Sequence, residues 1–210
     1  TMTKPALKKS EVYTYGDYLH WPDDERWEII EGIPYDMSPA PTRTHQRILI
    51  ELGSQINLAL RGNKCEVNIA PFDVRLPEAG QSEEETTTVV QPDLVVVCDP
   101  KKLDDKGCIG APDWIVEIIS PSTSQKDQTE KVQLYEKHRV KEYWIIHPAD
   151  RLVTVRILDK NGKYAAPKIL KPEGIISVSA VPGLKVDLDL LFKAIPAQQT
   201  SKIKASPRKK

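Results

Sequence analysis

The stretch 114–146 constrains the fold most strongly, because it has the pattern of a strand, a helix and a second strand in succession. Both ends of this stretch are short, mostly apolar runs, which is typical of buried strands. The helix between them is expected to end near Arg139 and to begin with Ser122 or Ser124 as its capping residue. Such a unit predicts an α/β (or α+β) fold, in which helices flank a mixed central sheet.

The rest of the chain supplies further strands and helices around this unit. Helical spacing of apolar residues, β-branched runs and turn residues mark these segments. We expect a short helix at 14–22, two strands around Glu31 and Gly32, a helix from Thr42 or Thr44 to about Arg61, strands at 67–77 and 89–99, and a hairpin through Asn161 and Gly162. The paired strands are interpreted as antiparallel hairpins added to the central sheet.

Length and charge indicate one domain with basic ends. Residues 11–195 are enough for a single domain with a hydrophobic core. The chain has 30 Lys and Arg against 30 Asp and Glu, so its net charge argues neither for nor against a polyanionic partner. Basic residues gather in 1–10 and 196–210, which we expect to be disordered tails; the alternative is that the C-terminal tail tethers DNA.

The cysteines and the hydropathy indicate the cellular setting. Cys65, Cys98 and Cys108 form no CxxC pair, and their odd number argues against a disulfide framework. A reducing compartment, and hence a cytoplasmic location, is therefore expected. No apolar run approaches the ~20 residues that span a bilayer, and the N-terminus lacks the apolar core of a signal peptide. The sequence thus predicts no membrane association.

Glu117 is a candidate functional residue, because its charged side chain interrupts the apolar run 114–119. A buried carboxylate is costly unless it is paired or binds a metal. Asp113 shares its strand face but lies about 13 Å away at about 3.3 Å per residue, too far to share one ion, and is interpreted as a turn residue. Asp93 is on another strand; if the two strands are neighbours, about 4.8 Å apart, Asp93 and Glu117 can bind one Mg²⁺ or Mn²⁺.

A lysine is the usual third group beside two such carboxylates, where it contacts the attacking water or the developing charge. The position two after the glutamate is Ile119, which cannot serve. The following helix offers Lys131 instead, on the stripe that also carries Leu134 and Tyr135 and therefore faces the sheet. Asp127, one turn earlier, is positioned to pair with Lys131.

Each of these residues also has a purely structural interpretation. Glu117 can be an edge residue with its head in water, Asp93 a turn aspartate, and Lys131 a lysine whose ammonium extends to solvent. The sequence contains no phosphate-binding loop and no GxGxxG, GxSxG or HExxH pattern. Its four histidines have no close ligand spacing, so zinc is not expected.

The order of aspartate, glutamate and lysine resembles the PD-(D/E)XK nuclease superfamily. The longer run from QPDLVVV to KEYWIIHP, with EIIEGIPYDMSPAPTRTHQRI before it and VPGLKVDLDLLF after it, resembles the Uma-two (Uma2) family of "putative restriction endonucleases". This resemblance covers roughly residues 12–193. It implies a restriction-endonuclease-like core and metal-dependent hydrolysis of phosphodiester bonds in DNA.

The resemblance also implies roles for single residues. Asp93 matches the aspartate of the PD motif and Glu117 the second acidic residue, which makes both metal ligands. Lys131 matches the lysine, moved from the strand to the next helix. Glu31 and His45 match further residues near the cleft, Glu31 as a supporting or additional metal ligand and His45 as a contact to substrate or water.

Our first hypothesis is therefore a DNA endonuclease that depends on Mg²⁺ or Mn²⁺. Its catalytic residues are Asp93, Glu117 and Lys131, with Asp127 orienting the lysine, and a homodimer is expected because cutting both strands often uses two symmetric sites. The second hypothesis is a catalytically silent nuclease-fold module for nucleic-acid binding or assembly. A third, a phosphodiesterase of small nucleotides, requires a closed pocket. Sequence preference is not predicted, because no base-reading motif is visible.

Overall fold

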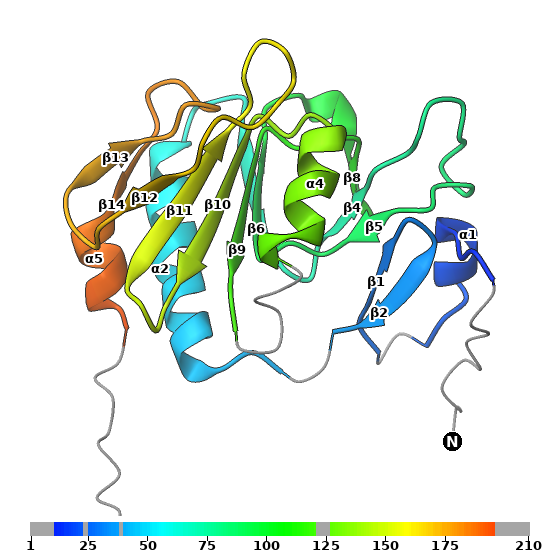
Figure 1. Ribbon diagram of the computed structural model, residues 1–210, viewed down its shortest axis with the longest axis horizontal. Helices are drawn as coiled ribbons and strands as arrows, with labels where there is room; N and C mark the ends of the chain where they lie inside the picture. The colour runs from blue at the N-terminus through cyan, green and yellow to red at the C-terminus, as the bar shows by residue number, and fades with distance from the viewer. Residues whose placement is uncertain (1–10, 23–24, 38–39, 121–126, 196–210) are drawn as a thin grey trace, which may run out of the picture.

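The computed structural model describes residues 11–22, 25–37, 40–120 and 127–195 (Figure 1). Within them, helices flank two six-stranded sheets and one two-stranded sheet, which confirms the predicted class of mixed sheet with flanking helices. The two tails and the predicted capping serines, Ser122 and Ser124, lie outside the described residues. In the described part of the chain, no helix has the length and apolar character needed to cross a membrane.

The first sheet contains the predicted strand–helix–strand unit, with strands in the order β12–β11–β10–β9–β6–β3. Its strands are β3 (Glu66–Ile69), β6 (Leu94–Val97), β9 (Trp114–Ile118), β10 (Glu142–His147), β11 (Leu152–Ile157) and β12 (Lys168–Leu170). β9 and β10 pair in parallel, and the other neighbours are antiparallel. A parallel pair needs a crossover connection, and α4 (Glu130–Lys137) lies in it.

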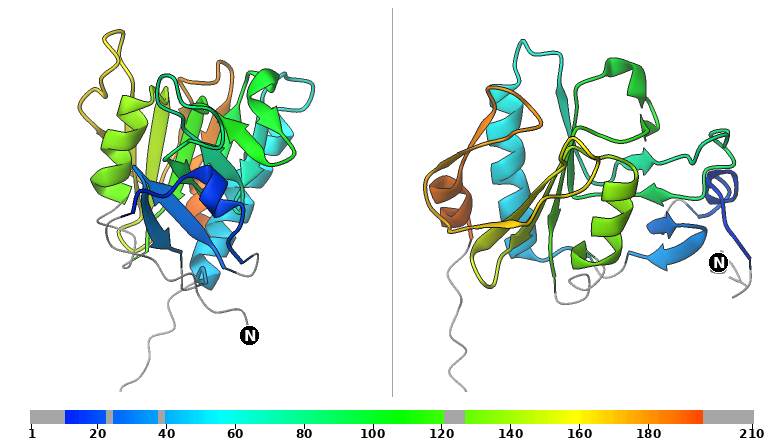
Figure 2. Two further views of the ribbon diagram at one scale, coloured as in Figure 1. Left: turned by 90° about the vertical axis from the view of Figure 1, so that its right-hand side faces the viewer. Right: turned by 45° about the horizontal axis from the view of Figure 1, so that its top comes forward.

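Helices cover both faces of this sheet, as Figure 2 shows for α2 and α4. The α2 face also carries α5 and a small hairpin. These elements are α2 (Arg43–Ala59), α5 (Leu188–Lys193), β13 (Ile175–Ser177) and β14 (Lys185–Asp187). Side chains alternate along β9, so that Trp114, Val116 and Ile118 join the core on the α2 side and Ile115 joins the core on the α4 side. Glu117 therefore points toward α4.

A second six-stranded sheet, which the sequence did not predict, lies beyond α4 (Figure 2). Its order is β2–β1–β5–β4–β8–β7. The elements here are α1 (Tyr15–Tyr18), β1 (Trp27–Ile30), β2 (Ile33–Asp36), β4 (Asp73–Arg75), β5 (Val89–Val90), a 3₁₀ turn (Pro100–Lys102), β7 (Leu103–Asp104) and β8 (Gly107–Ile109). One core cluster joins Val74 and Val90 of this sheet to Ile115 of β9 and Tyr135 of α4. The inward residues of α4 are thus enclosed from two sides.

The chain changes sheets at two prolines. The predicted strand 67–77 is β3 and β4 in different sheets, with the cis peptide bond to Pro71 between them. The predicted strand 89–99 is likewise β5 and β6, with Pro92 between them. Proline has no N–H to continue a ladder, which explains why each strand breaks there. As a result, the short segment 91–93 connects the two sheets and ends at Asp93.

Two predicted hairpins are confirmed. Glu31 and Gly32 form the turn between β1 and β2, with φ of 50° and 82°. Asn161 and Gly162 lie in the turn between β11 and β12, where Gly162 has a φ of 77°. Glycine adopts such left-handed values without the steric cost that other residues incur.

The prediction that the cysteines form no disulfide is wrong. Cys65 and Cys98 are linked, and Cys108 is a buried free thiol. Cys65 directly precedes β3 and Cys98 directly follows β6, and these antiparallel strands place Glu66 opposite Val97. The two cysteines therefore face each other one step further along the pair. Their separation of 33 positions in the chain gave no sign of this.

Candidate active site

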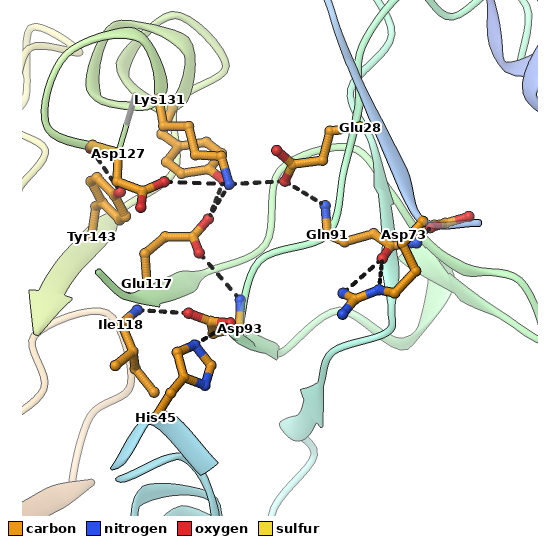
Figure 3. A network of polar contacts seen from close by, with 12 residues as sticks. Glu28, His45, Asp73, Gln91, Asp93, Glu117, Ile118, Asp127, Lys131 and Tyr143 are labelled. Atoms are coloured by element: carbon orange, nitrogen blue, oxygen red, sulfur yellow. Dashed lines mark hydrogen bonds and ion pairs between the residues drawn. The ribbon is translucent and has the colours of Figure 1, made fainter. Parts of the chain in front are cut away.

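The predicted pair of carboxylates lies at one end of the β6–β9 ladder. Leu94 pairs with Val116 in that ladder, so Asp93 and Glu117 are the next residues to face each other. The backbone N–H of Asp93 donates to Glu117 Oε2 at 3.4 Å, and the backbone N–H of Ile118 donates to Asp93 Oδ2 at 2.7 Å (Figure 3). Adjacent strands thus bring the two acids together, as the sequence predicted.

Lys131 reaches this pair from α4. Its Nζ lies 2.7 Å from Glu117 Oε1, 2.8 Å from Glu28 Oε1 and 3.6 Å from Asp127 Oδ1 (Figure 3). The lysine is only 3% exposed, so its ammonium does not extend to solvent. The helical stripe therefore predicted the direction of Lys131 correctly, and the i, i+4 contact with Asp127 is present.

Two buried tyrosines complete the surroundings of the lysine. Tyr135, one turn after Lys131, donates its hydroxyl to Glu117 Oε1 at 3.2 Å. Tyr143 on β10 donates its hydroxyl to the backbone carbonyl of Asp127 at 3.0 Å. The rings of the two tyrosines pack edge to face, with their centroids 4.9 Å apart. This packing fixes the start of α4 against the sheet and restricts where Lys131 can point.

His45 approaches the pair from the opposite face of the sheet. It lies in the first turn of α2, where the Thr42 hydroxyl caps the helix by accepting the His45 N–H at 3.2 Å. Its Nε2 is 3.0 Å from Asp93 Oδ1, and the side chains of His45 and Asp93 are 12% and 18% exposed. Because Glu117 and Lys131 are more deeply buried, the site is open to solvent on the side of Asp93 and His45.

The site carries more negative than positive charge. Burial raises the pKa of Glu117 well above its usual value, Lys131 opposes the shift, and Asp127, Asp93 and Glu28 add to it. Burial alone would lower the pKa of Lys131, but Glu117 and Glu28 outweigh it and hold that pKa well above its usual value. A lysine that stays charged does not balance this many acids, so an added cation is electrostatically favoured here.

The donor groups suit a hard divalent cation. Asp93 and Glu117 offer carboxylate oxygens, which Mg²⁺ and Mn²⁺ prefer, and Mg²⁺ usually keeps several waters while one or two carboxylates hold it. Among the residues that the structure describes, no three His, Cys, Asp or Glu side chains are grouped to hold one metal ion. The residues therefore fit an ion bound by two carboxylates and completed by water, and they do not offer a closed protein cage.

Glu31, which was expected near the cleft, lies elsewhere. It is at the β1–β2 turn, is 62% exposed, and pairs with Lys137 Nζ at 2.9 Å. The acid of this hairpin that meets Lys131 is Glu28, three positions earlier and buried in β1. The signal that singled out Glu117 was present here too, because Glu28 also interrupts an apolar run, Trp27–Ile30.

Asp113 makes structural contacts. This agrees with the sequence analysis, which judged it too far from Glu117 to share a metal ion. Its Oδ2 accepts the backbone N–H of Cys98 at 2.7 Å, and its Oδ1 accepts from Lys141 Nζ.

We expect Asp113→Asn to lower the free energy of unfolding by about 1–2 kcal/mol, because a hydrogen bond to a charged acceptor is weakened. Cleavage should stay within about twofold of wild type, since the residue touches no reacting group. Urea unfolding and a cleavage assay on the same protein test both points, and a large loss of cleavage at unchanged stability would contradict them.

Comparison with known proteins identifies the family. The model of the Uma2 family, described as "Putative restriction endonuclease", matches residues 15–190. An uncharacterized protein of Synechocystis sp. strain PCC 6803 is 28% identical over 121 residues, which are 57% of this chain and 60% of that relative. The match thus spans less than two thirds of the relative. A crystal structure from Anabaena variabilis, described as that of a "putative nuclease", has the same fold, with a TM-score of 0.68 at 23% identity over 87% of this chain and 99% of the other. Because the family model matches most of its length, this chain belongs to the Uma2 family.

Proposed function

We propose that the chain is a nuclease that hydrolyses phosphodiester bonds in DNA with the help of Mg²⁺ or Mn²⁺. The observation that carries this proposal is the meeting of Asp93, Glu117 and Lys131 at the end of the β6–β9 ladder. Two opposed carboxylates beside one buried ammonium are the groups that metal-assisted phosphodiester hydrolysis uses. Membership of a family described as "Putative restriction endonuclease" supports the same reaction.

The residues of the site divide the work between them. Asp93 and Glu117 would hold the divalent ion, which supplies Lewis-acid stabilisation of charge on the phosphate when it is bound. Lys131 contributes a fixed positive charge at the inner side of the site, where it stabilises the charge that develops on the phosphoryl oxygens or orients the attacking water. Asp127 orients the Lys131 ammonium, and Tyr135 orients the Glu117 carboxylate through its hydroxyl. His45, whose Nε2 lies 3.0 Å from Asp93 Oδ1, would contact the substrate or a water beside Asp93.

One observation favours a second function, a silent module that binds nucleic acid without cutting it. Lys131 Nζ already contacts two carboxylates at 2.7 and 2.8 Å, and its side chain is buried. An ammonium saturated in this way has less capacity to contact a phosphate. Binding of labelled duplex DNA without any metal-dependent product would favour this module over the nuclease.

The direct test is cleavage of supercoiled plasmid by the purified protein. We expect nicked and linear products with Mg²⁺ or Mn²⁺ and none with EDTA, because the divalent ion would supply the Lewis acid that stabilises charge on the phosphate. Glu130→Gln is the matched control for substitutions of the site residues. Glu130 is exposed, lies next to Lys131 in the chain and contacts the Tyr35 hydroxyl. This variant should cleave like wild type. Equal cleavage in EDTA would contradict metal dependence, and no cleavage under any metal would leave only the silent module.

We also propose a homodimer as the active form, because two symmetric sites allow both strands of a duplex to be cut. Light scattering coupled to size exclusion measures this directly. A mass of one chain at the concentration used for cleavage would contradict it.

A further inference from the structure

Glu28 is a buried acid that neither the sequence nor the two-carboxylate site accounted for. It lies in β1 of the second sheet and is 1% exposed. Its Oε1 accepts from Lys131 Nζ at 2.8 Å and from the backbone N–H of Gln91 at 3.0 Å (Figure 3). The carboxylate therefore holds the proposed catalytic lysine from the side of the second sheet, away from β9, which carries Glu117.

Gln91 is itself held firmly, which makes it a rigid support for Glu28. Its side-chain amide donates to Asp73 Oδ1 at 2.9 Å and to the Tyr18 hydroxyl at 3.1 Å. Its carbonyl oxygen accepts from Arg26 Nη2 at 2.9 Å and from Nε at 3.1 Å. The same segment, 91–93, ends at Asp93. One short stretch between the two sheets thus orients both Glu28 and a proposed metal ligand.

The two closest carboxylate partners of Lys131, Glu117 and Glu28, are not equivalent for the proposed reaction. Glu117 would share its charge with a divalent ion, and that ion would repel the nearby ammonium. With Glu117 bound to the ion, Glu28 at 2.8 Å would be the closest remaining anionic contact of the ammonium, since Asp127 lies at 3.6 Å. In Figure 3 the Glu28 carboxylate points toward the Lys131 ammonium, to which it gives a second close anionic contact.

We propose that Glu28 is a positioning residue for Lys131, which anchors the ammonium from the second sheet so that Glu117 is free to bind the metal. The catalytic importance of this anchoring rests on the proposed nuclease function. The contact between Glu28 and Lys131 is a property of the metal-free protein, so the anchoring and the nuclease function can be tested separately.

The first experiment observes the ammonium directly in metal-free protein. In protein labelled with ¹⁵N-lysine, a buried and ion-paired ammonium exchanges slowly and gives a resolved proton–nitrogen signal. Lys131→Arg assigns that signal by its loss. We expect the signal to persist in Glu130→Gln, to weaken in Glu28→Gln and to disappear in Glu28→Ala, with circular dichroism showing that each variant is folded. An unchanged Lys131 signal in folded Glu28→Ala would overturn the anchoring.

The second experiment separates positioning from metal binding. We expect Glu28→Gln to lower kcat for plasmid cleavage about 10²-fold while KM for DNA stays within about twofold, as loss of an interaction needed only in the transition state does. The Kd for Mn²⁺ from calorimetry should stay within about threefold of wild type, because the Glu28 carboxylate is hydrogen-bonded to Lys131 and to the Gln91 backbone and not to either proposed metal ligand. A loss of Mn²⁺ binding as large as that of Glu117→Gln would make Glu28 a metal ligand and overturn the proposal. If wild-type protein does not cut DNA, the nuclease function fails while the ammonium signal still decides the anchoring.

Discussion

Lys131→Met is expected to abolish cleavage and to lower the free energy of unfolding by about 3–5 kcal/mol, the cost of removing one partner from a buried ion pair. Methionine has a similar volume, so the loss comes from charge: Glu117 and Glu28 would remain buried without their shared cation. The pKa of Glu117, which burial already raises, would then rise further, because Lys131 would no longer oppose the shift. Because a raised carboxyl pKa contributes stability below its unfolded value, the variant should lose stability as pH rises above about 4.5.

Urea unfolding of both proteins at pH 5 and pH 8 measures this effect. Lys137→Met is the matched control, because Lys137 is on the same helix but half-exposed, with Glu31 and Glu78 as its partners. Exposed pairs contribute about 1 kcal/mol or less, so this control should unfold almost like wild type. Equal stability of Lys131→Met and Lys137→Met would show that Lys131 does not balance the buried acids.

Glu117→Gln and Asp93→Asn are each expected to reduce metal-dependent cleavage by about 10³-fold or more, because each removes half of the charge that would hold the ion. The effect of Glu117→Gln on the free energy of unfolding should be much smaller than its effect on cleavage. Burial already raises the pKa of Glu117, so neutralising it removes a desolvation cost, while Lys131 keeps Glu28 at 2.8 Å. In metal-free buffer, Glu117→Gln should therefore be at least as stable as wild type. Such a residue is retained for function at the expense of stability.

A second buried glutamate in the same sheet provides the control. Glu142 on β10 accepts from Trp144 Nε1 at 2.6 Å and from the backbone N–H of Ala180 at 2.8 Å, and burial raises its pKa as well. Glu142→Gln should reduce stability, since the single oxygen of an amide cannot replace both carboxylate oxygens that now accept hydrogen bonds. Cleavage should stay within about twofold of wild type. If this variant loses as much cleavage as Glu117→Gln, the effect at Glu117 comes from altered packing and not from lost chemistry.

The core of the site was predictable because its signals are local. Glu117 is conspicuous as a charge in an apolar strand, and the position of Lys131 follows from the helical repeat that also places Tyr135. The pairing of Asp93 with Glu117 needed one further assumption, that their strands are neighbours, and β6 and β9 are neighbours. The strand–helix–strand pattern at 114–146 also predicted the mixed main sheet, in which β9 and β10 are parallel.

The parts that were missed depend on long-range packing. β5 and β7 have two residues each, too few to show any periodicity, so the second sheet was not visible in the sequence. Without that sheet, nothing indicated that Glu28 would meet Lys131, 103 positions away, and Glu31 was chosen from the same hairpin instead. The Cys65–Cys98 bond has the same origin, because only the pairing of β3 with β6 brings the two residues together.

Calorimetric titration of Mn²⁺ into the metal-free protein tests the shared ion site most directly, because it does not depend on finding the right nucleic acid. We predict one saturable site per chain in the wild-type protein and in Glu142→Gln. The same titration should show markedly weaker binding in Asp93→Asn and in Glu117→Gln, since each leaves one carboxylate where the wild-type site has two. Saturable binding of equal strength in all four proteins, or no heat from the wild-type protein at millimolar Mn²⁺, would contradict a divalent ion held between Asp93 and Glu117.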